Sequence, residues 1–360
     1  MAETQAIQTQ DSISQALNAA LKRAEEAEQD NPLVYDVDSA RLVIFSDQHK
    51  GNRDGADDFQ VCEKAYNAAL AYYFREGYTL IVLGDAEELW EERPKTVINA
   101  YPHTLALEGK FHQAGRYIRI WGNHDDNWQY PDQVQKWLAP ALGGDPLQVQ
   151  EQALIRIREG ETELGRLFLI HGHQGTFESD FIAPLSEFFV RYFWRPFQRL
   201  FKISLNTPAN DFQLRYAHDS AMYFWSEAQH KTVLIAGHTH RPVFKSESHE
   251  AKIRKSIEKI EKQLQKDPDN PELRKKAAEL AAHLEWVLVV NGQNQGELPA
   301  IELKKPSYFN TGCCAFRDGD VTGIEIRDGE IRLIHWPDDE NLPRPKVLAH
   351  TDLRAVFDAC

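Results

Sequence analysis

Long apolar runs and cysteines are scarce in this sequence. No run of about 18 apolar residues is present that could span a bilayer. The four cysteines are Cys62, Cys313, Cys314 and Cys360; two are adjacent and none has the paired spacing of a thiolate metal site, which favours reduced thiols. The first thirty residues are acidic and amphipathic, without the basic start and apolar core of a signal peptide. We therefore expect a cytoplasmic protein.

An excess of positive charge is also missing. The 360 residues carry a formal net charge of −14. Because binding to a nucleic-acid backbone requires a basic surface, this charge argues against a nucleic-acid partner. The hydrophobic share of 42% is enough for a substantial core, in one large α/β domain or in two smaller ones.

Five apolar runs are present, and each leads into residues that can bind a metal ion. The runs are residues 41–46, 79–83, 117–121, 166–170 and 232–236. Short β-branched runs bounded by Gly or Asp predict buried strands, and their near-continuous apolarity predicts a sheet that is covered on both faces. If the strands run parallel, their carboxyl ends meet at one edge of the sheet. The polar residues that follow them would then form a single site.

These polar residues have the composition of a two-metal centre. The candidate ligands are Asp47, His49, Asp85, Asn123, His171, His238 and His240. Oxygen and nitrogen donors without a thiolate suit Mn, Fe or Zn better than a structural zinc knot. The set is too large for one ion. Two divalent ions about 3.5–4 Å apart, bridged by one carboxylate, would use all of it and leave room for a hydroxide and a substrate phosphate.

The ordered motifs resemble the signature of the calcineurin-like metallophosphoesterases. They are Asp-x-His from Asp47, Gly-Asp ending at Asp85, Gly-Asn-His-Asp at 122–125, His-Gly-His at 171–173 and Gly-His-Thr-His at 237–240. The resemblance covers residues 41–336. It implies an α/β fold with a layered β-sheet core flanked by helices, in a domain that spans residues 36–345.

The resemblance also implies a role for each residue. One metal would be held by Asp47, His49, Asp85 and His240, and the other by Asp85, Asn123, His171 and His238, so that Asp85 is the bridge. His124 would contact the phosphate and protonate the leaving oxygen, with Asp125 orienting its ring. Mn is the cation we expect first, with Fe or Zn as alternatives. For His173 three roles stay open: support of the ligands, contact with the substrate, or simple filling of space.

Two segments extend the likeness to one branch of this superfamily, the enzymes that hydrolyse UDP-2,3-diacylglucosamine. These segments are Gly-Asp-Ala-Glu-Glu-Leu-Trp at 84–90 and Gly-His-Thr-His-Arg-Pro at 237–242. Members of that branch have Arg at the position of His124 and an acidic residue at the position of His173. The departures leave open whether the substrate is lipid-linked or soluble.

An insertion at residues 174–231 contains an aromatic and basic stretch. On a helix, Arg191, Arg195 and Arg199 would form one cationic stripe because they are spaced four residues apart. Three interpretations remain open. The stretch could bind anionic lipid at the inner face of a membrane, it could be a lid that contacts an acylated phosphate substrate, or it could be a buried helix with solvated arginines.

The rest of the chain adds helices and a hairpin to the core. Residues 1–35 predict an N-terminal helical extension, with a helix of about three to four turns behind Asp11. Helices at 59–76 and 95–113 would connect the first three strands, and Asp-Gly at 328–329 predicts a β-hairpin. Residues 246–286 predict an antiparallel helical hairpin that extends the core, joins two copies of the chain or binds a partner. We expect residues 346–360 to form a C-terminal tail.

From the sequence we therefore predict a dinuclear metal-dependent phosphoesterase in which a metal-bridging hydroxide attacks phosphorus. The expected substrate is a phosphodiester or nucleotide-type diphosphate, either a small molecule or a lipid-linked compound resembling UDP-2,3-diacylglucosamine. A generic phosphomonoesterase or phosphodiesterase is the alternative within the enzyme class. A catalytically silent metal-binding scaffold that acts through its helical hairpin is the alternative outside it.

Overall fold

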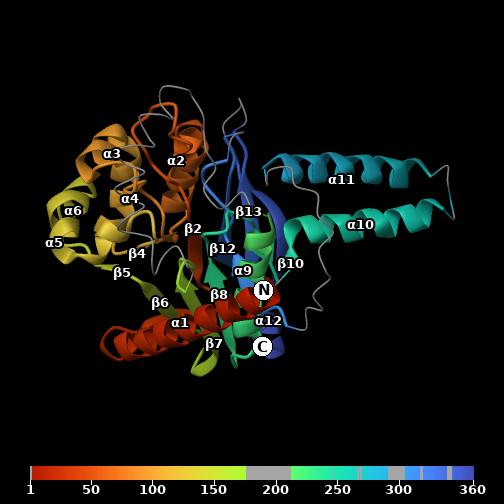
Figure 1. The fold of residues 1–360 in the computed structure, drawn as a ribbon, viewed down its shortest axis with the longest axis horizontal. Coiled ribbons are helices and arrows are strands. Elements are labelled where there is room, and N and C mark those ends of the chain that lie inside the picture. Colours follow the sequence, from red (N-terminus) through yellow and green to blue (C-terminus); the bar gives the residue numbers. More distant parts are fainter. Residues whose placement is uncertain are drawn as a thin grey trace.

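Two mixed β-sheets form the centre of the protein in the computed structural model (Figure 1). The structure describes residues 2–175, 212–245, 247–265, 267, 270–290, 305–316, 319–338 and 343–360. The first sheet has the order β14 (Lys346–Asp352), β13 (Glu330–Trp336), β12 (Val321–Arg327), β2 (Arg41–Phe45), β3 (Thr79–Leu83), β4 (Tyr117–Ile120) and β5 (Val149–Gln150). The second has the order β1 (Leu33–Asp36), β6 (Gln152–Glu159), β7 (Thr162–Ile170), β8 (Thr232–Ala236), β11 (Tyr308–Asn310), β9 (Val243–Phe244) and β10 (Glu247–Ser248).

The five predicted strands are present, but they belong to two sheets and not to one. Strands β2, β3 and β4 are parallel neighbours in the first sheet, whereas β7 and β8 are parallel neighbours in the second. The α/β class is therefore confirmed, and the expectation of a single sheet edge was wrong. Periodicity could not reveal the division, because a strand covered by another sheet and a strand covered by a helix have equally apolar sequences.

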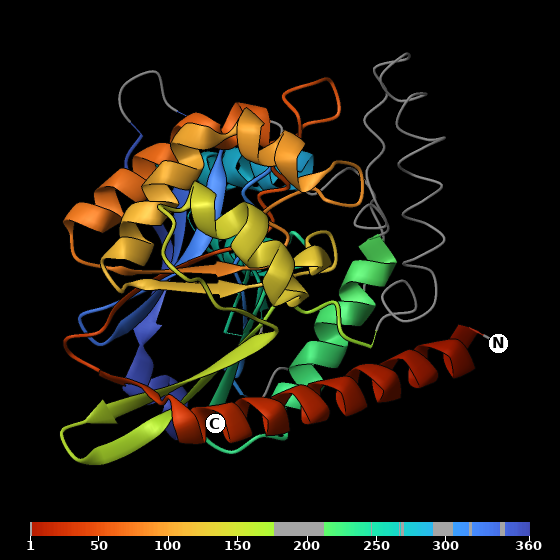
Figure 2. The same cartoon turned by 90° about the vertical axis from the view of Figure 1, so that its left-hand side faces the viewer.

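The alternating side chains of β2 show how the layers are arranged. Leu42 and Ile44 belong to the core between the two sheets, whereas Val43 and Phe45 belong to the core under the outer helices. Helices α2 (Phe59–Arg75) and α4 (Pro102–Gln113) cover the first sheet, and α1 (Ala2–Asp30) and α9 (Phe212–Glu227) cover the second (Figure 2). The order of layers is helices, sheet, sheet, helices.

The connecting helices follow the prediction with one division. Helix α2 matches the predicted 59–76, but the predicted 95–113 is split into α3 (Pro94–Ala100) and α4. Pro102 causes the split because proline lacks the N–H that a helix interior needs, and it instead begins α4. Shorter segments follow β4: a 3₁₀ helix η1 (Asp126–Gln129), α5 (Pro131–Gln133), a π-helical segment η2 (Val134–Leu138) and α6 (Ala139–Ala141).

The two ends of the chain are part of the fold. Helix α1 is longer than predicted, and its apolar side lies on the outer face of the second sheet through Ile13, Leu17 and Leu21. Residues 346–360 form strand β14 and helix α12 (Leu353–Ala359) and not a separate tail. Val356 and Phe357 of α12 are buried in the core between the sheets, and this burial holds the C-terminal segment against the body of the protein.

Both predicted hairpins are present in the described residues. Strands β12 and β13 pair antiparallel across the turn at Asp328 and Gly329. Helices α10 (His249–Leu264) and α11 (Pro271–Val290) lie side by side and project from the body of the protein (Figure 1). Within the described part of the chain, no helix is long and apolar enough to cross a bilayer.

Candidate metal centre

The ends of strands from both sheets bring the predicted ligands together. Among the described residues, three groups of side chains have ligand atoms within 4.8 Å of one another. The groups are Asp47 with His49 and His240, Asp85 with His171 and His238, and His49 with Asp85 and His124. Because the third group shares one residue with each of the other two, the three groups form one continuous centre.

The contacts inside the centre are short and involve nitrogen and oxygen donors. His240 Nε2 lies 3.2 Å from Asp47 Oδ1 and 3.1 Å from His49 Nε2. His171 Nε2 lies 3.0 Å from Asp85 Oδ2, and His49 Nε2 lies 3.9 Å from the same oxygen. Asp85 thus belongs to the group that contains His171 and also approaches His49, a member of the group that contains His240.

Asn123 Oδ1 is buried and lacks a hydrogen-bond partner among the described residues, and His171 Nε2 is buried beside the Asp85 carboxylate at 3.0 Å. His171 Nδ1 lies 2.9 Å from the carbonyl oxygen of Leu83, to which it can donate its proton, so Nε2 can bind a cation once it has lost its own proton. Leaving buried polar atoms unsatisfied is costly unless a ligand uses them. These atoms therefore fit a metal ion.

The backbone is strained at the predicted ligands. Among the described residues, nine non-glycine residues have a positive φ, and five of them are candidate ligands. The five are Asp47 (φ 56°), His49 (49°), Asp85 (50°), His238 (68°) and His240 (55°). Each such residue costs free energy and persists where the surrounding structure imposes it, which is common at functional sites. The strain directs side chains from separate loops into one centre.

The motif glycines allow the ligands to approach the backbone closely. A Cβ atom on Gly84 would lie 2.5 Å from His171 Nδ1, and one on Gly122 would overlap the Asp85 carboxylate. Gly84 also has a φ of +84°, which a side chain would disfavour. Glycine is therefore needed in the Gly-Asp and Gly-Asn-His-Asp motifs for steric reasons.

The buried carboxylates control the protonation of the histidines. Burial disfavours the charged form of His171, but Asp85 outweighs it and raises the pKa of His171 to about 9. Burial likewise opposes the charge on His49, and Glu88 and Asp85 raise its pKa to about 9. Burial also raises the pKa of Asp85, yet His171 and His124 hold it well below its usual range. The centre is thus arranged to hold positive charge.

Glu88 is a site residue to which the sequence analysis gave no role. Its carboxylate lies 3.0 Å from His49 Nδ1 and 2.9 Å from His124 Nδ1, and both rings can donate to it. Trp90 stacks on the His124 ring at 4.3 Å between centroids. The acidic pair Glu87-Glu88 after Asp85 is a signal in the sequence, but the sequence does not show which of the two faces the histidines.

The Asp125 carboxylate makes different contacts from those that the resemblance implied. Its oxygens accept hydrogen bonds from the backbone N–H groups of Gly122 at 2.6 Å, Asp85 at 3.2 Å and Ala86 at 3.0 Å. Arg119 Nη2 also donates to it at 2.9 Å. Among these contacts none is to the His124 ring, which Glu88 orients instead. Asp125 therefore joins the loops after β3 and β4, and the prediction that it orients His124 was wrong.

A network of buried charges lies behind Asp125. Lys50 pairs with Glu87 at 3.1 Å and with Glu108 at 2.8 Å, and Arg119 pairs with the same two carboxylates. All four side chains are fully buried. The fold brings Asp125 and this network together from distant positions, so the sequence pattern could not reveal their contacts.

A second set of hydrogen bonds holds the loop that carries His238 and His240. The backbone N–H of His238 donates to Asp47 Oδ1 at 3.1 Å. Thr239 Oγ1 donates to Asp219 at 3.1 Å, and Asn310 Nδ2 donates to the carbonyl oxygen of Gly237 at 2.7 Å. Helix α9 and strand β11 thereby hold the Gly-His-Thr-His motif at 237–240 beside the Asp-x-His motif that begins at Asp47.

His173 and the arginines complete the predicted set. The His173 ring lies 5.5 Å from the His171 ring and 5.3 Å from that of Trp121, and it belongs to none of the three groups of ligand atoms. Burial and the neighbouring His171 lower the pKa of His173 to about 3, so its ring is neutral. Residues Arg191, Arg195 and Arg199 lie outside the described residues.

No protein-family model and no curated protein matches this chain.

Proposed function

We propose that this protein is a dinuclear metal-dependent phosphoesterase with the fold of the calcineurin-like metallophosphoesterases, and that it hydrolyses a phosphodiester or a nucleotide-type diphosphate. The observation that carries the proposal is that two groups of potential ligands share Asp85, beside an imidazole held by a carboxylate. Two facing sheets with helices on their outer faces support the same fold.

The chain provides two overlapping sets of ligands. Asp47, His49, Asp85 and His240 would hold one ion, and Asp85, Asn123, His171 and His238 the other. The nitrogen and oxygen donors suit Mn, with Fe or Zn as alternatives. When bound, such divalent ions supply polarisation of the phosphoryl oxygens and activation of water.

His124 would protonate the leaving oxygen. Burial disfavours its charged form, but Glu88 and Asp85 raise the pKa of His124 above its ordinary value, which favours the protonated ring that an acid catalyst requires. Because Nδ1 is held by Glu88, Nε2 is the ring atom that can donate this proton to the substrate. Trp90 covers one face of the ring and limits its movement.

Two classes of substrate are candidates: a soluble phosphate ester and a lipid-linked diphosphate. A soluble ester needs only the centre described above. A lipid-linked diphosphate would in addition use the cationic stripe of Arg191, Arg195 and Arg199, which would bring the protein to the surface of an anionic membrane.

The test is turnover of bis-p-nitrophenyl phosphate by the protein with added Mn²⁺, followed by a panel of phosphomonoesters, cyclic nucleotides, nucleotide diphosphates and UDP-diacylglucosamine. We expect hydrolysis that depends on Mn²⁺ and is lost with a chelator. Binding of two ions without turnover of any compound in the panel would contradict the enzyme proposal and favour a metal-binding scaffold.

A further inference from the structure

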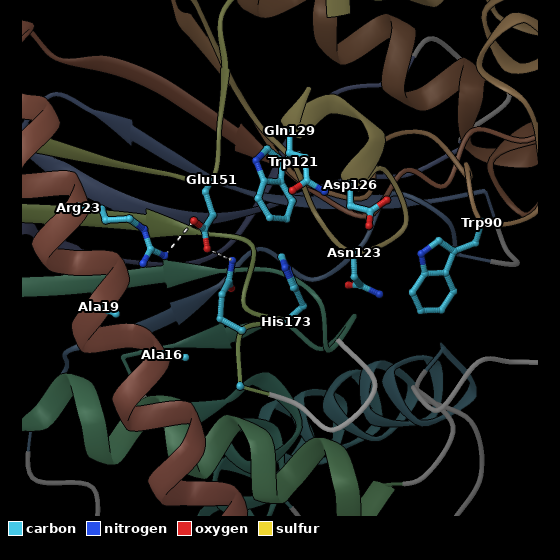
Figure 3. A pocket seen from close by; sticks show the side chains of 12 residues that line it. Ala16, Ala19, Arg23, Trp90, Trp121, Asn123, Asp126, Gln129, Glu151 and His173 are labelled. Carbon is cyan, nitrogen blue, oxygen red and sulfur yellow. Dashed lines mark hydrogen bonds and ion pairs between the residues drawn. The ribbon is translucent and has the colours of Figure 1, made fainter. Parts of the chain in front are cut away.

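A cavity of about 370 Å³ adjoins the candidate metal centre (Figure 3). Asn123 and His173 line the side nearest the centre, and Trp90, which stacks on His124, lines another. The volume lies in the range that binds small molecules in other proteins. A group attached to a phosphate at the centre would therefore extend into this cavity.

Helix α1 forms the wall opposite the metal ligands. Ala16, Ala19 and Arg23 face the cavity from successive turns of this helix. The helix is held firmly in place: Trp225 Nε1 donates to Asn18 Oδ1 at 2.8 Å, and a Cβ atom on Gly175 would lie 2.7 Å from the Ile13 Cα atom. The small side chains of Ala16 and Ala19 thus determine how much room the cavity has.

The chemistry of the lining excludes some occupants. Two indole rings, Trp90 and Trp121, are combined with the amides of Gln129 and Gln174, and with the carboxylates of Asp126 and Glu151. An acyl chain would leave these polar groups without water or hydrogen bonds, which is costly. Among the described residues of the lining, Arg23 is the single basic side chain, and it is already paired with Glu151 at 2.9 Å, so it offers little attraction to an additional anionic group.

We infer that this cavity binds a neutral, hydroxyl-bearing ring attached to the scissile phosphate, and that α1 sets its size. Indole faces pack against such rings, while amides and carboxylates accept and donate hydrogen bonds to hydroxyl groups. A sugar and a nucleoside share this chemistry. The inference rests on the proposed function, because the phosphate at the metal centre places the ring in the cavity.

The test compares ligands of the Mn-loaded protein by titration calorimetry. The probes are inorganic phosphate, glucose 1-phosphate, the four common nucleoside 5′-monophosphates and hexyl phosphate, and the quantity is the ratio of each Kd to that of inorganic phosphate. The variant Ala16→Leu/Ala19→Leu fills the cavity, and leucine retains the helix propensity of alanine. Ala27→Leu is the matched control, because Ala27 is exposed on the same helix and does not line the cavity.

We expect at least one ring-bearing phosphate to bind about tenfold more tightly than inorganic phosphate, and the tighter of the two classes identifies the ring as a sugar or a nucleoside. The double variant should raise this Kd ratio from about one tenth to within about threefold of one, whereas Ala27→Leu should leave it near one tenth. If the double variant does not fold, as judged by circular dichroism, Ala19→Leu alone gives the same comparison.

Three results would overturn the inference: tightest binding of hexyl phosphate, ring-bearing ligands that bind no more tightly than inorganic phosphate, or a ratio unchanged in the filled cavity. Failure of the proposed function has a different signature. In that case inorganic phosphate itself would not bind the Mn-loaded protein, and the inference would fall with the function.

Discussion

The Glu88 carboxylate lies 2.9 Å from His124 Nδ1, and through its second oxygen it also contacts the candidate metal ligand His49 at 3.0 Å. Burial raises the pKa of Glu88, but its interactions with His124 and His49 lower it to about 2, so the carboxylate stays ionised. One buried negative charge thus supports both a proposed metal ligand and the proposed acid.

We predict that Glu88→Gln weakens acid catalysis by His124. Without the carboxylate, the pKa of His124 falls, and a smaller fraction of the ring carries a proton above pH 7. For alkyl esters, kcat/KM should fall by about tenfold or more, and the alkaline limb of its pH profile should move to lower pH. Activated p-nitrophenyl esters, whose leaving groups need little protonation, should be affected much less.

The control for this variant is Glu161→Gln, which removes a carboxylate that is exposed at the turn between β6 and β7. Metal content must be measured in both variants because Glu88 also contacts His49. Equal slowing of alkyl and aryl esters at full metal content would count against acid catalysis by His124 and favour simple phosphate binding.

Asp85→Asn should lower metal content and activity together. The side chain keeps its size but loses the negative charge that two groups of ligands share. Elemental analysis should give fewer than two bound ions per chain, and turnover of bis-p-nitrophenyl phosphate should fall by at least about a hundredfold. A variant that retains two ions and near-normal turnover would show that Asp85 is misassigned.

Metal affinity should rise with pH. In the metal-free protein the pKa values of His49 and His171 are raised to about 9, so both rings are protonated at pH 7. A cation must displace these protons, and the apparent Kd for Mn²⁺ should therefore decrease as the pH increases from about 7 to 9. Calorimetry in buffers of different ionisation enthalpy should detect protons released on binding. A pH-independent Kd without proton release would contradict this assignment.

The sequence predicted those parts of the site that are local in the chain. Each candidate ligand comes shortly after an apolar run, so the run indicates a buried strand and its end indicates the position of Asp47, Asp85 or His171. The glycines of the motifs have the same local character. The positive φ angles of the ligands were not predictable, because they arise from the packing of loops that come from two sheets.

The contacts that the sequence missed are long-range. Glu88 was visible as part of an acidic pair, yet its approach to His49 and His124 depends on how the loops after β2 and β4 meet. The wall that α1 forms beside Asn123 is a contact between distant parts of the chain. Neither periodicity nor motif spacing carries such information, since both describe only the residues near each motif.

The last prediction concerns the buried network behind Asp125. Arg119→Met would leave Glu87, Glu108 and Asp125 buried without a cation that now contacts all three. Removing one partner of a buried ion pair typically costs about 3–5 kcal/mol, which urea unfolding of the metal-free protein would measure. Because Asp125 joins the loops that carry Asp85 and Asn123, metal content should fall as well.

The control is Lys22→Met, which removes a cation from an exposed pair with Glu26 on α1 and should change stability by less than about 1 kcal/mol. Equal stability of the two variants would show that the network does not hold these loops in place.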